Sequence, residues 1–117
     1  MEEGVGRQNR NRFQDDPVLV EIVRRLVKAF QPDRIYLFGS KARAEESPDS
    51  DYDLIIVVPD DAAPEKHRSR LAYQVLRGTV AAADVLVWKR ETFEGRLHLK
   101  ASLPATVMRE GILLYAS

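Results

Sequence analysis

The sequence predicts an α/β (α+β) domain, in which helices pack against a small mixed β-sheet. Two observations predict this class. Apolar residues recur at helical spacing between Leu19 and Phe30. Two apolar segments of strand length then follow, at Arg34–Phe38 and Asp51–Val58, and further helical and strand patterns alternate after them. The chain of 117 residues has room for one hydrophobic core, so we expect a single domain.

The first part of the chain is expected to form a tail and then a helix. Residues 1–12 are polar and without periodicity, which predicts a flexible tail before a domain at residues 13–117. The helix is expected to begin at Pro17, because Asp16 can cap it and proline favours the first helical position. Pro32 should end it.

The two segments after this helix are predicted strands. In the second one, the apolar stretch Leu54–Val58 indicates a strand buried on both faces in the middle of the sheet. A second helix is expected from residue 63 or 64 to Arg77, with Gly78 as its C-cap. Its outer face is basic, through Lys66, His67, Arg68 and Arg70. Such a face is usually only solvated; contact with a partner or a nucleotide is the alternative.

Helical and strand patterns also alternate in the last part of the chain. The expected elements are a strand at 83–88, a short helix within 92–100 that is interrupted at Gly95, and a helix capped by Ser102 that runs to Glu110. Residues 112–115 are expected to form a short strand or a packed tail.

Two motifs beside the first two strands point to chemistry. Asp51 and Asp53 are two residues apart, so on a strand their side chains share one face with Cα atoms about 6.6 Å apart. Two carboxylates so placed can hold Mg²⁺, which prefers oxygen ligands. Gly39 allows a ligand to approach the main chain, and Ser40 is a candidate N-cap followed by amides that could bind an anion. A phosphate site followed by a metal-binding pair suits a nucleoside triphosphate.

Asp84 is a third candidate ligand. It opens an otherwise apolar strand, where an unpaired buried carboxylate would be costly. A metal ion already held by Asp51 and Asp53 would be a suitable partner. The alternative is an aspartate at a strand edge that faces water. His67 and His98 lie far apart in the sequence, which argues against a zinc site.

The order and spacing of these motifs resemble the signature of the minimal nucleotidyltransferases, a branch of the DNA polymerase β-like superfamily. The matching residues are Gly39, Ser40, Ala42, Arg43, Ser50, Asp51, Asp53 and Leu54. The sequence departs from the pattern at Ala44, where the family usually has glycine. This departure affects the turn after Arg43 and removes no ligand. The resemblance extends from about Leu19 to Tyr115.

The resemblance implies transfer of AMP from ATP to an acceptor hydroxyl with two Mg²⁺ ions. The implied site contains the catalytic and metal-binding acids Asp51, Asp53 and Asp84 and the nucleotide-binding residues Gly39, Ser40 and Arg43. Asp84 would also act as general base. Arg43 would either reach the phosphates or pair with a nearby carboxylate.

Minimal members of this family are commonly paired with a toxin of the HEPN type and act as its antitoxin. The resemblance therefore implies a protein acceptor, adenylylated on a tyrosine hydroxyl. The first alternative is a binding module that neutralises its partner by contact, with only residual activity. The second is a small-molecule nucleotidyltransferase that completes its pocket as a homo-oligomer.

The composition argues against several other classes of protein. The 18 basic and 18 acidic residues cancel, so no overall field attracts nucleic acid or membrane, and we expect direct contact with neither. There is no cysteine, which excludes disulfides and fits a reducing compartment. No apolar run approaches the roughly 20 residues of a membrane span. We therefore expect a cytoplasmic protein.

Overall fold

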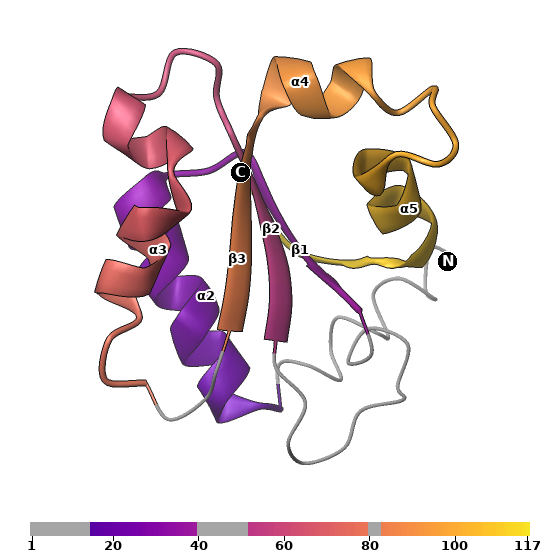
Figure 1. Ribbon diagram of the computed structural model, residues 1–117. Coiled ribbons are helices and arrows are strands. Elements are labelled where there is room, and N and C mark those ends of the chain that lie inside the picture. The colour runs from indigo at the N-terminus through magenta and orange to yellow at the C-terminus, as the bar shows by residue number, and fades with distance from the viewer. Residues whose placement is uncertain (1–14, 40–51, 80–82) are drawn as a thin grey trace.

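The computed structural model describes residues 15–39, 52–79 and 83–117 (Figure 1). The elements in chain order are α2 (Pro17–Phe30), β1 (Arg34–Phe38), β2 (Tyr52–Val58), the 3₁₀ helix η1 (Pro64–His67), α3 (Ser69–Val75), β3 (Ala83–Lys89), α4 (Arg90–Gly95), α5 (Leu103–Glu110) and β4 (Ile112–Ala116). This order of helices and strands confirms the predicted fold class. The tail at residues 1–12 lies outside the described residues.

The strands form one mixed sheet in the order β3-β2-β1-β4. β1 is antiparallel to both β2 and β4, whereas β2 and β3 are parallel. The parallel pair needs a crossover, which η1 and α3 supply. β2 lies in the interior of the sheet, and all its residues except Asp53 are buried, as the apolar stretch predicted.

Helices cover both faces of the sheet (Figure 1). α2 and α3 cover one face, where they pack on Leu54, Ile56 and Val85. On the opposite face, Ile55 and Val57 pack with Phe93 of α4 and Val107 of α5. Because strand side chains alternate, successive residues of β2 enter opposite cores.

α2 begins and ends where the sequence predicts. The Oδ1 atom of Asp16 accepts hydrogen bonds from the amides of Val18 and Leu19, at 3.1 and 3.2 Å, and Pro17 takes the first turn. At the other end Gln31 has φ 48°, and its N–H bonds to the carbonyl of Val27. The acid and proline signals were therefore sufficient to locate the helix.

The predicted second helix is divided in two, which corrects the expectation of one helix from residue 63 or 64 to Arg77. Arg68 is extended, with φ −123° and ψ 138°, and separates η1 from α3. α3 also ends earlier, at Val75. Gly78 has φ +91° in the turn that follows rather than acting as the C-cap.

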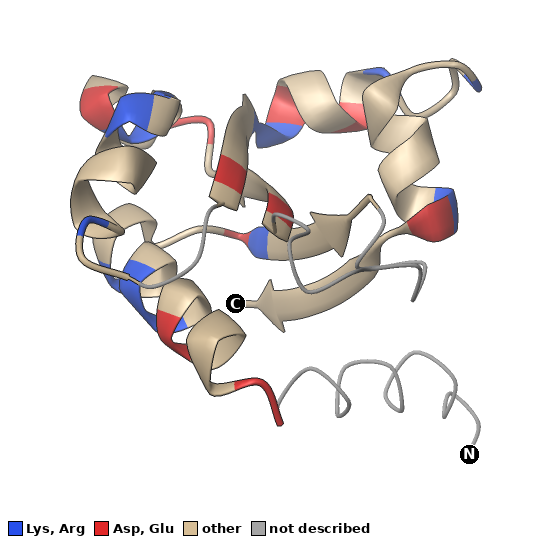
Figure 2. Ribbon diagram, turned by 60° about the horizontal axis from the view of Figure 1, so that its bottom comes forward, with Lys and Arg blue, Asp and Glu red and all other residues tan. Residues whose placement is uncertain are grey.

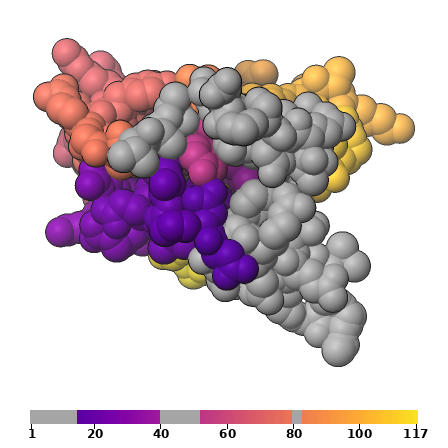
Figure 3. All heavy atoms as spheres, turned by 90° about the horizontal axis from the view of Figure 1, so that it is seen from below, coloured from indigo at the N-terminus to yellow at the C-terminus, as the bar shows by residue number. Residues whose placement is uncertain are grey.

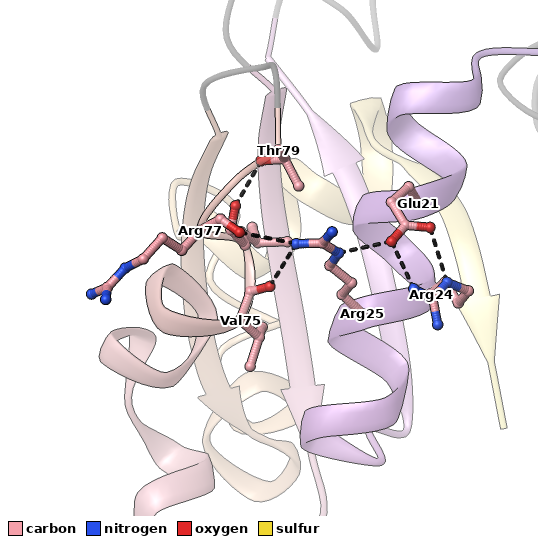
Figure 4. Close-up of polar contacts among 7 residues, drawn as sticks. Glu21, Arg24, Arg25, Val75, Arg77 and Thr79 are labelled. Carbon is pink, nitrogen blue, oxygen red and sulfur yellow. Dashed lines mark hydrogen bonds and ion pairs between the residues drawn. The ribbon is translucent and has the colours of Figure 1, made fainter.

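Contacts from outside the helix explain the early end of α3 (Figure 4). Arg25 of α2 donates from Nη1 to the carbonyls of Val75 and Arg77, at 3.1 Å each. Thr79 donates its hydroxyl proton to the carbonyl of Leu76 at 2.8 Å. These terminal carbonyls are satisfied without a further helical turn.

Glu21 holds the Arg25 side chain in position. Its carboxylate accepts hydrogen bonds from Arg24 and Arg25, which lower the pKa of Glu21 from 4.5 to about 2 (Figure 4). The same guanidinium of Arg25 thus links α2 to the end of α3.

The C-terminal part follows the sequence signals closely. α4 stops at Gly95, as expected. Ser102 caps α5 by accepting from the amide of Ala105 at 3.2 Å, and the helix ends before Gly111. β4 then pairs with β1. None of the helices in the described ranges combines the length and the apolar character needed to cross a membrane.

Candidate active site

The structure brings Asp53 and Asp84 together. In the parallel register of β2 and β3 these two residues are direct partners, and strands so paired lie about 4.8 Å apart. Paired residues point to the same face of the sheet. Tyr52 and Leu54 point to the α2 and α3 side, so both carboxylates lie on the α4 and α5 side. Figure 2 shows acidic positions, in red, on neighbouring strands of the sheet.

Gly39 lies against the same carboxylate. It follows β1 directly, and Phe38 is the register partner of Asp53. Its φ of +81° is a conformation that side chains rarely adopt. A Cβ atom at this position would also overlap Oδ2 of Asp53 and lie 3.2 Å from its Cγ. Glycine is therefore required here both by backbone conformation and by space.

The remaining predicted residues, Ser40, Arg43 and Asp51, lie outside the described residues. Asp51 immediately precedes the first residue of β2. Among the described residues alone, no cluster of three or more acidic, histidine or cysteine side chains forms a metal site. The described part of the predicted site is therefore the pair Asp53 and Asp84 beside Gly39.

This pair is suited to Mg²⁺. Carboxylate oxygens are the ligands that this ion prefers, and two of them on adjacent strands can share it. The missing Cβ of Gly39 leaves room beside one oxygen of Asp53. Asp84 is exposed, so it also remains accessible to a substrate.

The exposure of Asp84 corrects one expectation. The sequence suggested a buried carboxylate that needs a partner, but the side chain is open to solvent, as in the alternative that faces water. The reason is that Asp84 lies near the start of β3, whereas α4 and α5 cover this face further along the sheet, at Ile55 and Val57. Its position beside Asp53 still agrees with the predicted role.

The open area extends beyond Asp84. Leu86, two residues further along β3 on the same face, is 42% exposed, although its register partner Ile55 is fully buried. Figure 3 views the end of the molecule at which β2 and β3 begin, away from α4 (compare Figure 1). The acids therefore lie at the end of the sheet that α4 does not cover.

Tyr52 anchors the start of β2 from the opposite face. It is 6% exposed, and its hydroxyl donates a 2.6 Å hydrogen bond to Oδ2 of Asp16, the residue that caps α2. Burial and this hydrogen bond raise the pKa of Tyr52. The carboxylate of Asp16 thus joins the N-terminus of α2 to the strand residue that precedes Asp53.

The sequence analysis did not identify this link. The available signal was Tyr52 itself, because strand alternation places it on the apolar face, where a phenol hydroxyl needs a hydrogen-bond partner. Nothing local indicated that the partner would be a helix cap at Asp16, which lies 36 residues earlier.

Comparison with known proteins agrees with this geometry. Residues 18–114 match the family model described as a nucleotidyltransferase domain. The fold is similar to that of a Sulfolobus solfataricus protein proposed to be a nucleotidyltransferase, with a TM-score of 0.56, 18% identity, and 95% of this chain and 86% of that chain covered. Comparison with curated proteins gave no match.

Two further structures share the fold. The first is a toxin–antitoxin with AMP-PNP, with a TM-score of 0.53, 20% identity, and 83% of this chain and 73% of that chain covered. The second is a mutant of the toxin–antitoxin MntA–HpeT, with a TM-score of 0.51, 17% identity, and coverage of 81% and 71%. At such identities the likeness shows a common fold.

Proposed function

The chain belongs to the nucleotidyltransferase domain family, and from this premise we propose that it transfers AMP from ATP to a hydroxyl group of a protein partner. The observation that carries the proposal is the pairing of Asp53 and Asp84 on adjacent strands beside Gly39. A family match alone does not guarantee a working site, whereas this arrangement provides the acids that the reaction needs.

Each residue has a role in this reaction. Asp51, Asp53 and Asp84 hold two Mg²⁺ ions. Bound there, the ions supply charge stabilisation at the attacking and leaving oxygens. The main chain at Gly39 and Ser40 binds the β- and γ-phosphates. Arg43 either binds phosphate or pairs with a carboxylate; its role, like that of Ser40, rests on the sequence.

Asp84 is suited to receive the acceptor proton because it is exposed on the edge strand. The hydroxyl proton passes to its carboxylate as the oxygen forms a bond to the α-phosphorus. The bond from the α-phosphorus to its bridging oxygen breaks, and pyrophosphate leaves. Tyr52 supports this step indirectly, because its hydrogen bond to Asp16 holds the start of β2.

A protein acceptor is favoured by two related likenesses. The sequence resembles the minimal nucleotidyltransferases, which are commonly paired with toxins of the HEPN type. Two of the structures with the same fold are described as toxin–antitoxin assemblies. The proposed acceptor is a tyrosine hydroxyl of such a toxin, and its modification would silence the toxin.

Transfer of label from α-labelled ATP tests the proposal. The chain is co-purified with a candidate toxin of the HEPN type, and Mg²⁺ and labelled ATP are added. We expect label on the partner and an increase in Tm of the chain with Mg²⁺ and ATP, because the ions relieve repulsion between the carboxylates. Asp84→Asn should lower the transfer rate by about 10²–10⁴-fold, the range for loss of a general base. Asp53→Asn should abolish the Tm increase as well.

Absence of both transfer and Tm increase in the parent chain would refute the proposal. Neutralisation of the partner by Asp53→Ala, without transfer, would instead identify a protein that acts by contact. Lys100→Ala is a suitable control, because this exposed lysine lies between α4 and α5, away from the acids.

A further inference from the structure

The outer face of α3 and the adjoining edge of β3 form a surface that the reaction itself does not use. The sequence left the basic face of this region open between solvent and a partner. In the structure Arg68, Arg70 and Arg77 are exposed. In the described part of the chain, none of their guanidinium groups has an acidic or other hydrogen-bond partner. Figure 4 shows the Arg77 side chain directed away from Arg25, although Arg25 binds its carbonyl.

This surface is hollowed. A depression of about 580 Å³ is lined by Ser69, Arg70, Tyr73, Gln74 and Arg77. A second depression of about 420 Å³ adjoins it, because Arg70 and Gln74 line both, and Arg68 borders the second. A partner that fills these depressions would meet the guanidinium group of Arg70 in both, together with Arg77 in the first and the carboxylate of Glu65 in the second. An acidic partner is therefore favoured mainly at the first depression.

The first depression adjoins the strand that carries Asp84. The hydroxyl oxygen of Tyr73 accepts from the amide of Val85 at 3.4 Å, so Tyr73 lies along the free edge of β3. The side chain of Val85 is buried among the α2 and α3 core, whereas Leu86 faces the other way. The edge of β3 is thus bordered by Tyr73 on one side and Leu86 on the other.

Both border residues are exposed apolar side chains. Within the described ranges five large hydrophobic residues are exposed, and Tyr73, at 49%, and Leu86, at 42%, are two of them. Protein interfaces are enriched in tyrosine and arginine at their centres. The edge strand of a sheet is also a common site of protein association, although here the amide of Val85 is already bonded to Tyr73.

We propose that this surface docks the acceptor protein, and that the partner presents aspartate or glutamate side chains to Arg70 and Arg77. The inference rests on the proposed function, because it concerns the partner of the same site. Guanidinium groups bind carboxylates in a bidentate manner. A partner bound along β3 would bring a hydroxyl to Asp84 while its flanking acids reach around the edge to α3.

An acidic protein segment fits this surface better than nucleic acid. The chain has a formal net charge of zero, so there is no general attraction for a polyanion. The arginines are also combined with the apolar Leu86 and the half-exposed Tyr73, and this mixture matches a protein interface.

Labelled peptides test the inference. One short peptide carries a tyrosine flanked by glutamates, and its matched control carries glutamines in their place. Binding to the full chain is measured by fluorescence anisotropy. We expect the glutamate peptide to bind more tightly and its affinity to fall with salt. Arg70→Glu and Arg77→Glu should each weaken binding by about tenfold, and Lys100→Glu, the same charge change elsewhere, by less than about twofold.

Two results would overturn the inference. One is equal binding of both peptides or no loss in the two arginine variants. The other is binding of a single-stranded RNA probe, but not the peptide, through Arg70 and Arg77. The Tm increase with Mg²⁺ and ATP separates the two proposals. If the parent shows this increase and the arginine variants bind the peptide normally, the docking proposal is wrong and the proposed function stands. If the parent shows neither the increase nor AMP transfer, the proposed function is wrong.

Discussion

The two faces of the sheet differ in how far the helices cover them. On the α2 and α3 side, alternate residues of β2 from Tyr52 to Val58 are buried. On the α4 and α5 side, Ile55 and Val57 are buried, but Asp53 is partly exposed and its neighbours Asp84 and Leu86 are exposed. One strand therefore contributes to a complete core on one face and to both a core and an open site on the other.

This difference shows how a small domain can carry reactive groups without weakening its core. Asp53 and Asp84 lie near the starts of β2 and β3, beyond the part of this face that α4 and α5 cover. Tyr52, which directly precedes Asp53 in the chain, is fixed within the covered face through Asp16. A contact on the covered face therefore fixes the strand residue next to Asp53, which lies on the open face.

Replacement of the register partners Ile55 and Leu86 by alanine should give the largest difference in stability between the covered and open parts of this face. Ile55→Ala removes a fully buried side chain and should lower the free energy of unfolding by about 2–5 kcal/mol. Leu86→Ala removes an exposed one on the same face and should lower it by about 1 kcal/mol or less. Urea denaturation measures both. Equal losses would contradict the assignment of an open and a covered part to this face.

Gly39→Ala and Gly78→Ala both strain the backbone, but only Gly39→Ala also places a methyl group against a residue of the proposed site. Both glycines have positive φ, so each substitution should lower the free energy of unfolding by about 1–2 kcal/mol. Only at Gly39 does the new methyl group collide with the carboxylate of Asp53; at Gly78 no atom lies within 4 Å. We therefore expect AMP transfer to be lost in Gly39→Ala alone.

Thermal denaturation and the labelled transfer assay check these two variants together. Unchanged transfer in Gly39→Ala would show that the position of Asp53 is not critical. Equal loss of transfer in Gly78→Ala would show that global destabilisation, and not the contact with Asp53, reduces the rate.

Tyr52→Phe should have a small effect on stability. It removes the hydrogen bond to Asp16 and should lower the free energy of unfolding by about 1 kcal/mol. Asp16→Ser removes the same bond but keeps an oxygen that can cap α2. If the bond is the shared cause, the double variant should lose no more than the larger single loss, as measured by urea denaturation. Additive losses would show that the two residues act separately.

The sequence predicted most elements because their signals are local. Asp16 and Pro17 start α2, Ser102 starts α5, and Gly95 ends α4, as expected. The early end of α3 at Val75 was missed, because the carbonyls of Val75 and Arg77 are bound by Arg25, far away in the sequence. Periodicity alone does not report such a contact.

For the site, the sequence supplied the residues and the structure their arrangement. Gly39 could be identified from its motif, but its contact with Asp53 depends on the register between β1 and β2. Asp84 was selected because it is acidic at the start of a strand. Its exposure depends on which part of this face α4 and α5 cover, and such packing is not encoded in any local pattern.

The residue types and their spacing by themselves determined a mixed α/β domain with an acidic pair after a glycine turn, because caps, breaks and alternation act within a few residues. Tertiary structure decided that β2 pairs with β3 in a register that aligns Asp53 with Asp84. It also placed the hydroxyl of Tyr52 at the cap of α2 and β3 at the edge of the sheet. These features depend on the packing of segments distant in sequence, which minimises exposed apolar surface over the whole chain.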